Sequence, residues 1–75
     1  MLQIGERIRR RLDEQNETVV WLSRQLSCSR TNVYKIFEKS NLDTGLLMRI
    51  STILKYDFFK LYSEELRKNN KSILR

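Results

Sequence analysis

The chain has 75 residues, with 15 Lys and Arg against 9 Asp and Glu, and a net charge of +6. A chain of this length builds one small core, and a 40% hydrophobic fraction without proline favours a folded all-α domain over a disordered chain. Because it has no histidine and one cysteine, we expect no enzyme, no bound metal and no cofactor.

The first predicted helix begins near Ile4 and ends near Gln15 and Asn16. Ile4, Ile8 and Leu12 recur every four residues between basic side chains. This spacing puts a narrow apolar stripe on a strongly basic helix. Its arginines are expected to form a solubilising surface that adds some non-specific attraction to phosphates.

A second helix is predicted to begin after Thr18, because a threonine hydroxyl suits the N-cap position. Val19, Leu22 and Leu26 share one face of this helix at i, i+3 and i+7. The apolar spacing breaks at Ser27. The second helix is therefore short, and a third follows it closely.

The third helix is predicted to begin after Ser29, which can also serve as an N-cap. The residues expected to face inward are Val33, Ile36 and Phe37. The residues expected to face outward are Arg30, Thr31, Tyr34 and Lys35. A short helix with an apolar back thus presents a polar and basic front.

Two further helices complete a predicted all-α bundle of about five short helices. Asp43 is placed to cap the fourth helix and Asp57 to start the fifth. The apolar residues of these two helices are Leu46, Leu47, Ile50, Ile53, Leu54, Phe58, Phe59, Leu61 and Tyr62. Residues 1–66 are expected to form one domain, and residues 67–75 a basic, frayed tail without apolar spacing.

The positive charge favours an anionic partner, and nucleic acid is favoured over a membrane surface. No stretch approaches the roughly 20 apolar residues of a membrane span. The N-terminus also lacks the apolar segment of a signal peptide. We therefore expect a cytoplasmic protein without a membrane partner.

Residues 18–37 have the spacing that a helix-turn-helix requires. A short helix, a turn of about three residues and a second short helix leave the N-terminal residues of the second helix free to contact bases. A rigid packing of the two helices would let a phosphate contact on one set the register of the other.

These features resemble the XRE/Cro-type, lambda-repressor-like helix-turn-helix family of small bacterial and phage regulators. The resemblance is carried by Ile8-Arg9 and by the stretches WLSRQLSCSRTNVYKIF and LLMRISTILKYDFFKLYS, and it covers residues 4–61. The closing DFFKLYS is similar to short members from the Bacteroides lineage. The resemblance implies a five-helix bundle that binds double-stranded DNA in the major groove, usually as a homodimer on a two-fold symmetric operator.

The resemblance also assigns residues to the DNA contact. These residues are Thr18, Arg30, Thr31, Asn32 and Lys35, and we add Ser29 and Tyr34 as further candidates. Arginine and lysine pair with guanine, asparagine with adenine, and the threonine methyl group with a thymine methyl group. Asn32 has the alternative roles of a phosphate contact or a cap, and Tyr34 could bind a phosphate or simply shield the helix pair.

Four positions depart from the family pattern. Val19 stands where many members carry a polar phosphate ligand, which leaves Thr18 and free backbone N–H groups for that role. Ser27 replaces a turn glycine, and a left-handed serine costs about 1 kcal/mol relative to glycine. Leu12 and Phe37 replace a buried Arg–Glu pair, and we expect these two side chains to touch in the core.

The favoured function is a sequence-specific DNA-binding transcriptional regulator, a repressor that acts by occupying its operator. One alternative is an antitoxin or mobile-element regulator with a small protein partner. Another is a protein-interaction module that no longer contacts DNA, for which the apolar Val19, Val20 and Trp21 are the support.

Two further expectations concern apolar surface. The aromatic residues of the fifth helix exceed what one terminal helix needs, which suggests a homodimer interface. Cys28 is expected to pack as a small apolar residue rather than act as a redox switch. Trp21 is expected to be at least partly buried.

Overall fold

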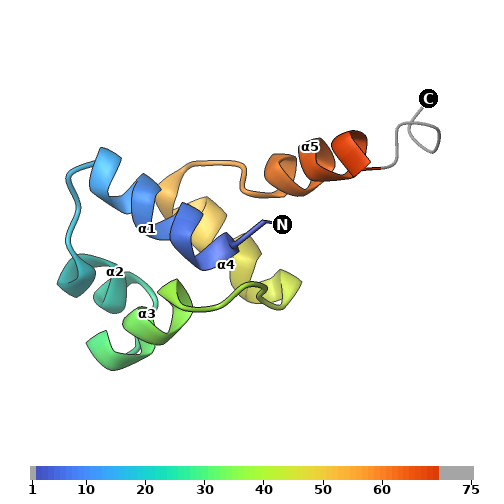
Figure 1. The fold of residues 1–75 in the computed structure, drawn as a ribbon. Helices are drawn as coiled ribbons and strands as arrows, with labels where there is room; N and C mark the ends of the chain where they lie inside the picture. Colours follow the sequence, from blue (N-terminus) through green and yellow to red (C-terminus); the bar gives the residue numbers. More distant parts are fainter. Residues whose placement is uncertain (1, 70–75) are drawn as a thin grey trace.

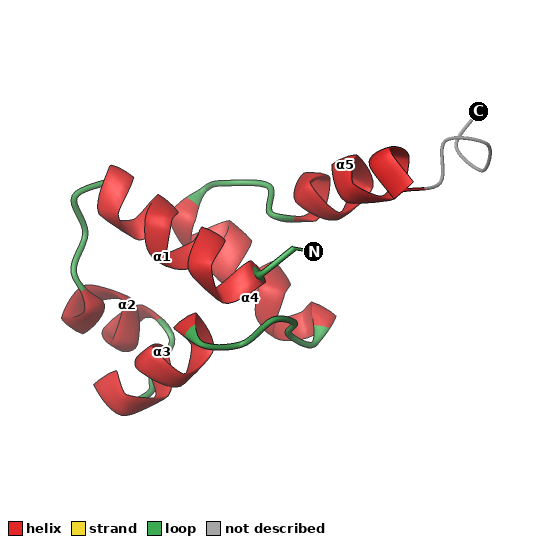
Figure 2. Cartoon of the chain, viewed as in Figure 1, coloured by secondary structure: helices red, strands yellow, loops and turns green. Residues whose placement is uncertain are grey.

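The computed structural model describes residues 2–69, which form helices joined by turns and, within this range, no β-strand (Figures 1 and 2). The helices are α1 (Ile4–Glu14), α2 (Val19–Gln25), α3 (Arg30–Phe37), α4 (Thr44–Leu54) and α5 (Phe59–Asn69). The predicted class, an all-α bundle of about five short helices, is confirmed. None of these helices, within the described part of the chain, is long and apolar enough to cross a bilayer.

Polar side chains begin four of the helices, as the sequence predicts. Thr18, Ser29 and Asp43 each accept a hydrogen bond from the backbone N–H three residues later, at 3.0, 3.2 and 2.8 Å. Asp57 Oδ1 accepts one from the N–H of Phe59 at 3.0 Å. Each bond satisfies a backbone donor that has no partner within its helix.

One hydrophobic core runs through the bundle. Its buried residues are Leu2, Ile4, Ile8, Leu12, Leu22, Leu26, Val33, Ile36, Phe37, Leu47, Ile50, Leu54, Phe58 and Leu61. The predicted inward faces of α1, α2 and α3 are therefore confirmed, except that Val19 is half-buried. On α4 the predicted face is too wide, because Leu46 and Ile53 are also half-buried at its edges.

The start of α1 lies directly against the end of α3. The backbone N–H of Gly5 donates to the carbonyl oxygen of Lys39 at 2.9 Å. A Cβ added at Gly5 would lie 2.6 Å from the carbonyl carbon of Phe37 and closer still to the carbonyl oxygens of Ile36 and Phe37. Only glycine permits so close an approach of two helix backbones.

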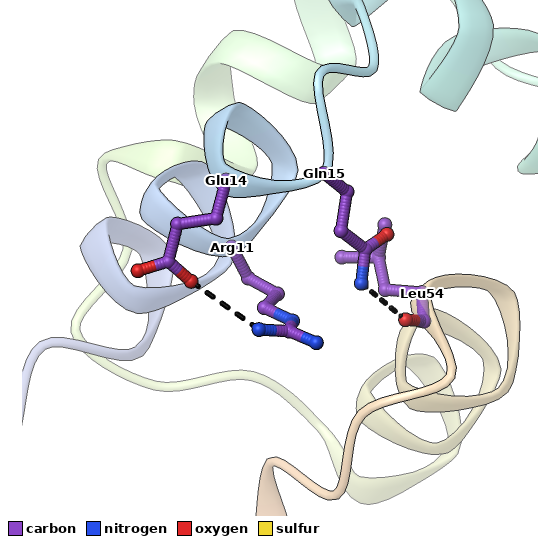
Figure 3. Close-up of polar contacts among 4 residues, drawn as sticks. All are labelled: Arg11, Glu14, Gln15 and Leu54. Atoms are coloured by element: carbon purple, nitrogen blue, oxygen red, sulfur yellow. Dashed lines mark hydrogen bonds and ion pairs between the residues drawn. The ribbon is translucent and has the colours of Figure 1, made fainter.

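The end of α1 is tied to the end of α4 (Figure 3). The side-chain amide of Gln15 donates to the carbonyl oxygen of Leu54 at 2.6 Å, which satisfies a carbonyl at the C-terminus of α4. Beside it, the Arg11 guanidinium lies 3.4 Å from the carboxylate of Glu14 and 4.6 Å from the centre of the Tyr56 ring. The arginines of α1 thus take part in packing as well as in solubility.

Replacing Gln15 with alanine is expected to lower the free energy of unfolding by about 1 kcal/mol, because the partly buried Leu54 carbonyl loses its donor. Urea unfolding followed by circular dichroism measures the change. The matched control is Gln25→Ala, since Gln25 is exposed and its loss should cost less than about 0.5 kcal/mol. Equal changes for the two variants would contradict the role assigned to Gln15.

The fifth helix extends away from the other four (Figure 1). Phe58 is fully buried, while Phe59 and Tyr62 are half-buried against the core. Burial raises the pKa of the Tyr62 hydroxyl above its ordinary value. A single chain therefore packs both phenylalanines, which removes the reason that the sequence offered for a dimer at these residues.

The end of α5 differs from the predicted boundary. We expected the ordered domain to stop at Leu66, whereas the helix continues to Asn69. Arg67 and Lys68 lie in its last turn, where positive charge interacts favourably with the helix dipole. Residues 70–75 of the predicted tail lie outside the described residues.

Candidate nucleic-acid interface

The pair formed by α2 and α3 is held together by a shared apolar side. Leu22 of α2, Leu26 directly after that helix, and Val33 and Ile36 of α3 are buried in the common core. Cys28, in the turn between the helices, is half-buried against the same core, as expected for a small apolar residue. This packing fixes the two short helices relative to each other.

The turn between α2 and α3 has a defined backbone path. Ser27 adopts the left-handed conformation, with φ of 55°, so the cost considered for a serine in this position applies. The N–H of Cys28 donates to the carbonyl oxygen of Ser23 at 2.9 Å. From α4, the Arg49 guanidinium donates to the carbonyl oxygen of Leu26 at 3.4 Å. The C-terminus of α2 is thus held from two sides.

Replacing Ser27 with glycine is expected to raise the free energy of unfolding by about 1 kcal/mol, since glycine adopts this conformation without a Cβ penalty. Thermal or urea unfolding measures the gain. The control Ser63→Gly lies at an exposed position inside α5 and should instead lower stability by a few tenths of a kcal/mol or more. A loss of stability in both variants would contradict the strain assigned to Ser27.

All seven residues predicted to contact DNA are exposed. They are Thr18, Ser29, Arg30, Thr31, Asn32, Tyr34 and Lys35. Among the described residues the one ion pair joins Arg11 to Glu14, so Arg30 and Lys35 keep their positive charges unpaired. The backbone N–H of Asn32 is taken by the Ser29 cap, while its exposed side-chain amide has no hydrogen bond to another described residue. The cap role considered for Asn32 is therefore filled by Ser29.

Helix geometry orders these residues across the outer side of α3. At about 100° per residue, Thr31, Lys35 and Glu38 lie opposite the buried side of the helix. Tyr34 lies on one flank and Asn32 on the other. The exposed Glu38 follows Lys35 at i+3 on the same face, a spacing that was visible in the sequence and that we had not used.

Tyr34 lies at the flank of α3 that faces α1. Its ring meets the ring of Phe37 edge to face, with centroids 6.1 Å apart, and the Arg9 guanidinium lies 5.8 Å from the centre of the Phe37 ring. Tyr34 nevertheless remains 52% exposed. It therefore covers part of Phe37, and most of its remaining surface is free for another contact.

A groove between α1 and α3 limits the basic surface on this side. It has a volume of about 770 Å³, and the charged residues that line it are Glu6, Arg9, Arg10, Asp13, Glu14 and Glu38. Because its four carboxylates outnumber its two guanidinium groups, this groove attracts a DNA backbone less than a purely basic surface does. A DNA contact centred on α3 would therefore extend from Tyr34 toward Lys35, away from α1.

The start of α2 is less apolar at its surface than its sequence suggests. Val19 and Trp21 are half-buried against the core, as expected for Trp21, and Val20 is 37% exposed. The apolar residues Val19, Val20 and Trp21 were the support for a protein-interaction module, and among these three only Val20 is classed as exposed. Thr18 stays exposed beside them with its hydroxyl oxygen bonded to the N–H of Trp21.

Leu12 and Phe37 are both buried in the core. The Phe37 backbone lies against Gly5, near the start of α1. Leu12 lies two turns further along that helix. The direct contact expected between Leu12 and Phe37 stays a prediction.

Several residues that shape this end of the molecule were missed from the sequence. The end of α3 is positioned by Gly5, the end of α4 by Gln15 and the end of α2 by Arg49. Gly5 alone carried a signal, since a glycine inside an apolar-periodic helix is unfavourable unless another backbone comes close. The other two act through contacts between helices that are distant in sequence.

Comparison of the chain with protein-family models, with curated proteins and with solved structures gives no match. The functional proposal below therefore rests on the fold and on the exposure and charge of the described residues.

Proposed function

We propose that this chain is a sequence-specific DNA-binding transcriptional regulator, a bacterial cytoplasmic repressor that acts by occupying its operator. The observation that carries the proposal is the outer side of α3. There, Thr31 and Lys35 are exposed opposite the side that packs into the core, and Arg30 is exposed at the start of the helix, on the flank of Tyr34. A rigid helix with unpaired basic residues at its free side is the element that enters a major groove.

Each side chain has a chemical role in this proposal. Arg30 and Lys35 donate to guanine O6 and N7, and the exposed side-chain amide of Asn32 pairs with adenine. The methyl group of Thr31 packs on a thymine methyl group. These contacts discriminate between bases because a mismatched base would leave a buried donor or acceptor without a hydrogen bond.

Phosphate contacts would set the register of α3. The Thr18 hydroxyl can donate to a phosphate while its oxygen caps α2, and Ser29 can do the same at the start of α3. The exposed hydroxyl of Tyr34 is a third donor. Such contacts orient the protein without selecting a sequence.

A homodimer on a two-fold symmetric operator is part of the proposal. Two copies would place their α3 helices in successive major grooves, about 34–36 Å apart. Because the chain packs Phe58 and Phe59 on its own core, the interface must use other surface.

The test is selection of bound sequences from a random duplex library near physiological salt. We expect an enriched inverted repeat, whose affinity exceeds that of scrambled DNA about a thousandfold or more. Titration at several salt concentrations separates base contacts from general attraction to phosphates. Flat enrichment with binding that disappears as salt rises would contradict the proposal and favour a protein partner instead.

A further inference from the structure

A second groove lies on the flank of α3 opposite Tyr34. It has a volume of about 250 Å³ and lies between α3, the preceding turn and the start of α4. Its apolar lining comes from Leu26, Cys28, Ile36 and Leu46. This volume is below the range of about 300–1,000 Å³ typical of drug-sized ligands, so the groove suits a smaller molecule.

The charged residues that line this groove are both basic. Lys35 lies on α3 and Lys39 lies two residues after the end of that helix, and both are exposed. Among the described residues, neither lysine forms an ion pair within the chain. The groove therefore combines an apolar lining with the amide of Asn32 and two lysines that form no ion pair within the described chain.

This combination selects one class of ligand. A bare phosphate would gain from the lysines and nothing from the apolar lining, whereas a neutral apolar molecule would gain from the lining alone. A small carboxylate with a short hydrocarbon part gains from both, because its chain leaves water while its charge pairs with the lysines.

We propose that the groove beside α3 binds a small apolar carboxylate, which inhibits DNA binding. The inhibitory part rests on the proposed function, since Lys35 belongs both to the groove and to the surface proposed to contact bases. A carboxylate that holds the Lys35 ammonium withdraws it from guanine and adds a negative charge beside the phosphates. The binding part is independent of DNA.

Cys28 makes the binding directly measurable, because it is the one cysteine of the sequence and lines the groove. Mass spectrometry measures the rate at which iodoacetamide alkylates Cys28. This rate should fall when hexanoate is added, and the hexanoate concentration that gives half-maximal protection should be on the order of 10 mM. Protection should strengthen about fourfold for each methylene that becomes buried along the series acetate, butyrate, hexanoate. Sodium chloride at equal ionic strength is the reference.

The contribution of the lysine charge to carboxylate binding is tested with Lys39→Ala, which leaves the proposed base contacts intact. Protection by hexanoate should become at least about threefold weaker in this variant. The control Lys68→Ala removes the same charge from α5 and should leave protection unchanged. Protection of equal strength by acetate, by hexanoate and by neutral 1-hexanol would overturn the proposal, as would no protection at all.

Inhibition is measured separately, by titrating the selected operator in hexanoate and in sodium chloride of equal ionic strength. We expect hexanoate to weaken operator affinity in the natural chain and to do so less in Lys39→Ala. Thiol protection without loss of operator affinity would overturn the inhibitory part alone. If no operator is found, the alkylation experiment still decides whether the groove binds carboxylates.

Discussion

Replacing Gly5 with alanine is expected to lower the free energy of unfolding by about 3 kcal/mol, a large share of the about 5–15 kcal/mol that stabilises a small domain. The added methyl group would overlap the carbonyl groups of Ile36 and Phe37. Since both partners are backbone, α1 and α3 must move apart, which also stretches the bond from Gly5 to Lys39. Urea unfolding followed by circular dichroism measures the loss.

The matched control is Gly45→Ala, the same substitution at the other glycine of the chain. A Cβ at Gly45 meets one side-chain oxygen of Asp43 at 3.3 Å and otherwise open space. Its effect on stability should stay within about 1 kcal/mol in either direction. A Gly5→Ala variant as stable as the control would show that the α1–α3 contact tolerates a wider spacing than the structure has.

Replacing both Arg30 and Lys35 with alanine is expected to weaken binding to the selected operator about a hundredfold or more, because each base contact contributes about 1–3 kcal/mol of discrimination. The fold should be unaffected, since both side chains are exposed. Fluorescence anisotropy with labelled operator and with scrambled DNA measures the two affinities. The ratio between them should fall together with the operator affinity.

The control for this variant is Arg67→Ala with Lys68→Ala, which removes the same two charges from the exposed side of α5. It should weaken binding to both DNAs alike and only slightly, because it changes the general attraction to phosphates. If the two double variants lose affinity equally on both DNAs, the contact is electrostatic, and the assignment of base contacts to α3 is wrong.

The helix starts could be predicted because they depend on neighbouring residues. Thr18, Ser29 and Asp43 each bond to a backbone N–H three residues away, a distance within which the sequence alone specifies the partner. Ser27 belongs to the same class, since a short gap between two capped helices requires a sharp turn. The exposure of the candidate DNA-contacting residues followed from the apolar spacing of Val33, Ile36 and Phe37.

The packing of the aromatic residues near the fifth helix could not be predicted from the sequence. Periodicity shows that Phe58 and Phe59 are apolar neighbours, but it does not show how much core lies within their reach. Phe58 precedes α5 and is fully buried, and Phe59 packs beside it. Whether an apolar residue serves the core or an interface depends on where the other helices leave space.

The amino-acid sequence by itself determined the helix class, the caps, the turn at Ser27 and the polar outer side of α3, because these depend on hydrogen bonds and spacings within a few residues. Tertiary structure alone decided the α1–α3 contact at Gly5, the bonds of Gln15 and Arg49 to distant helix ends, and the groove beside Lys35 and Lys39. Those features depend on which backbones meet, and that is set by the packing of the whole core.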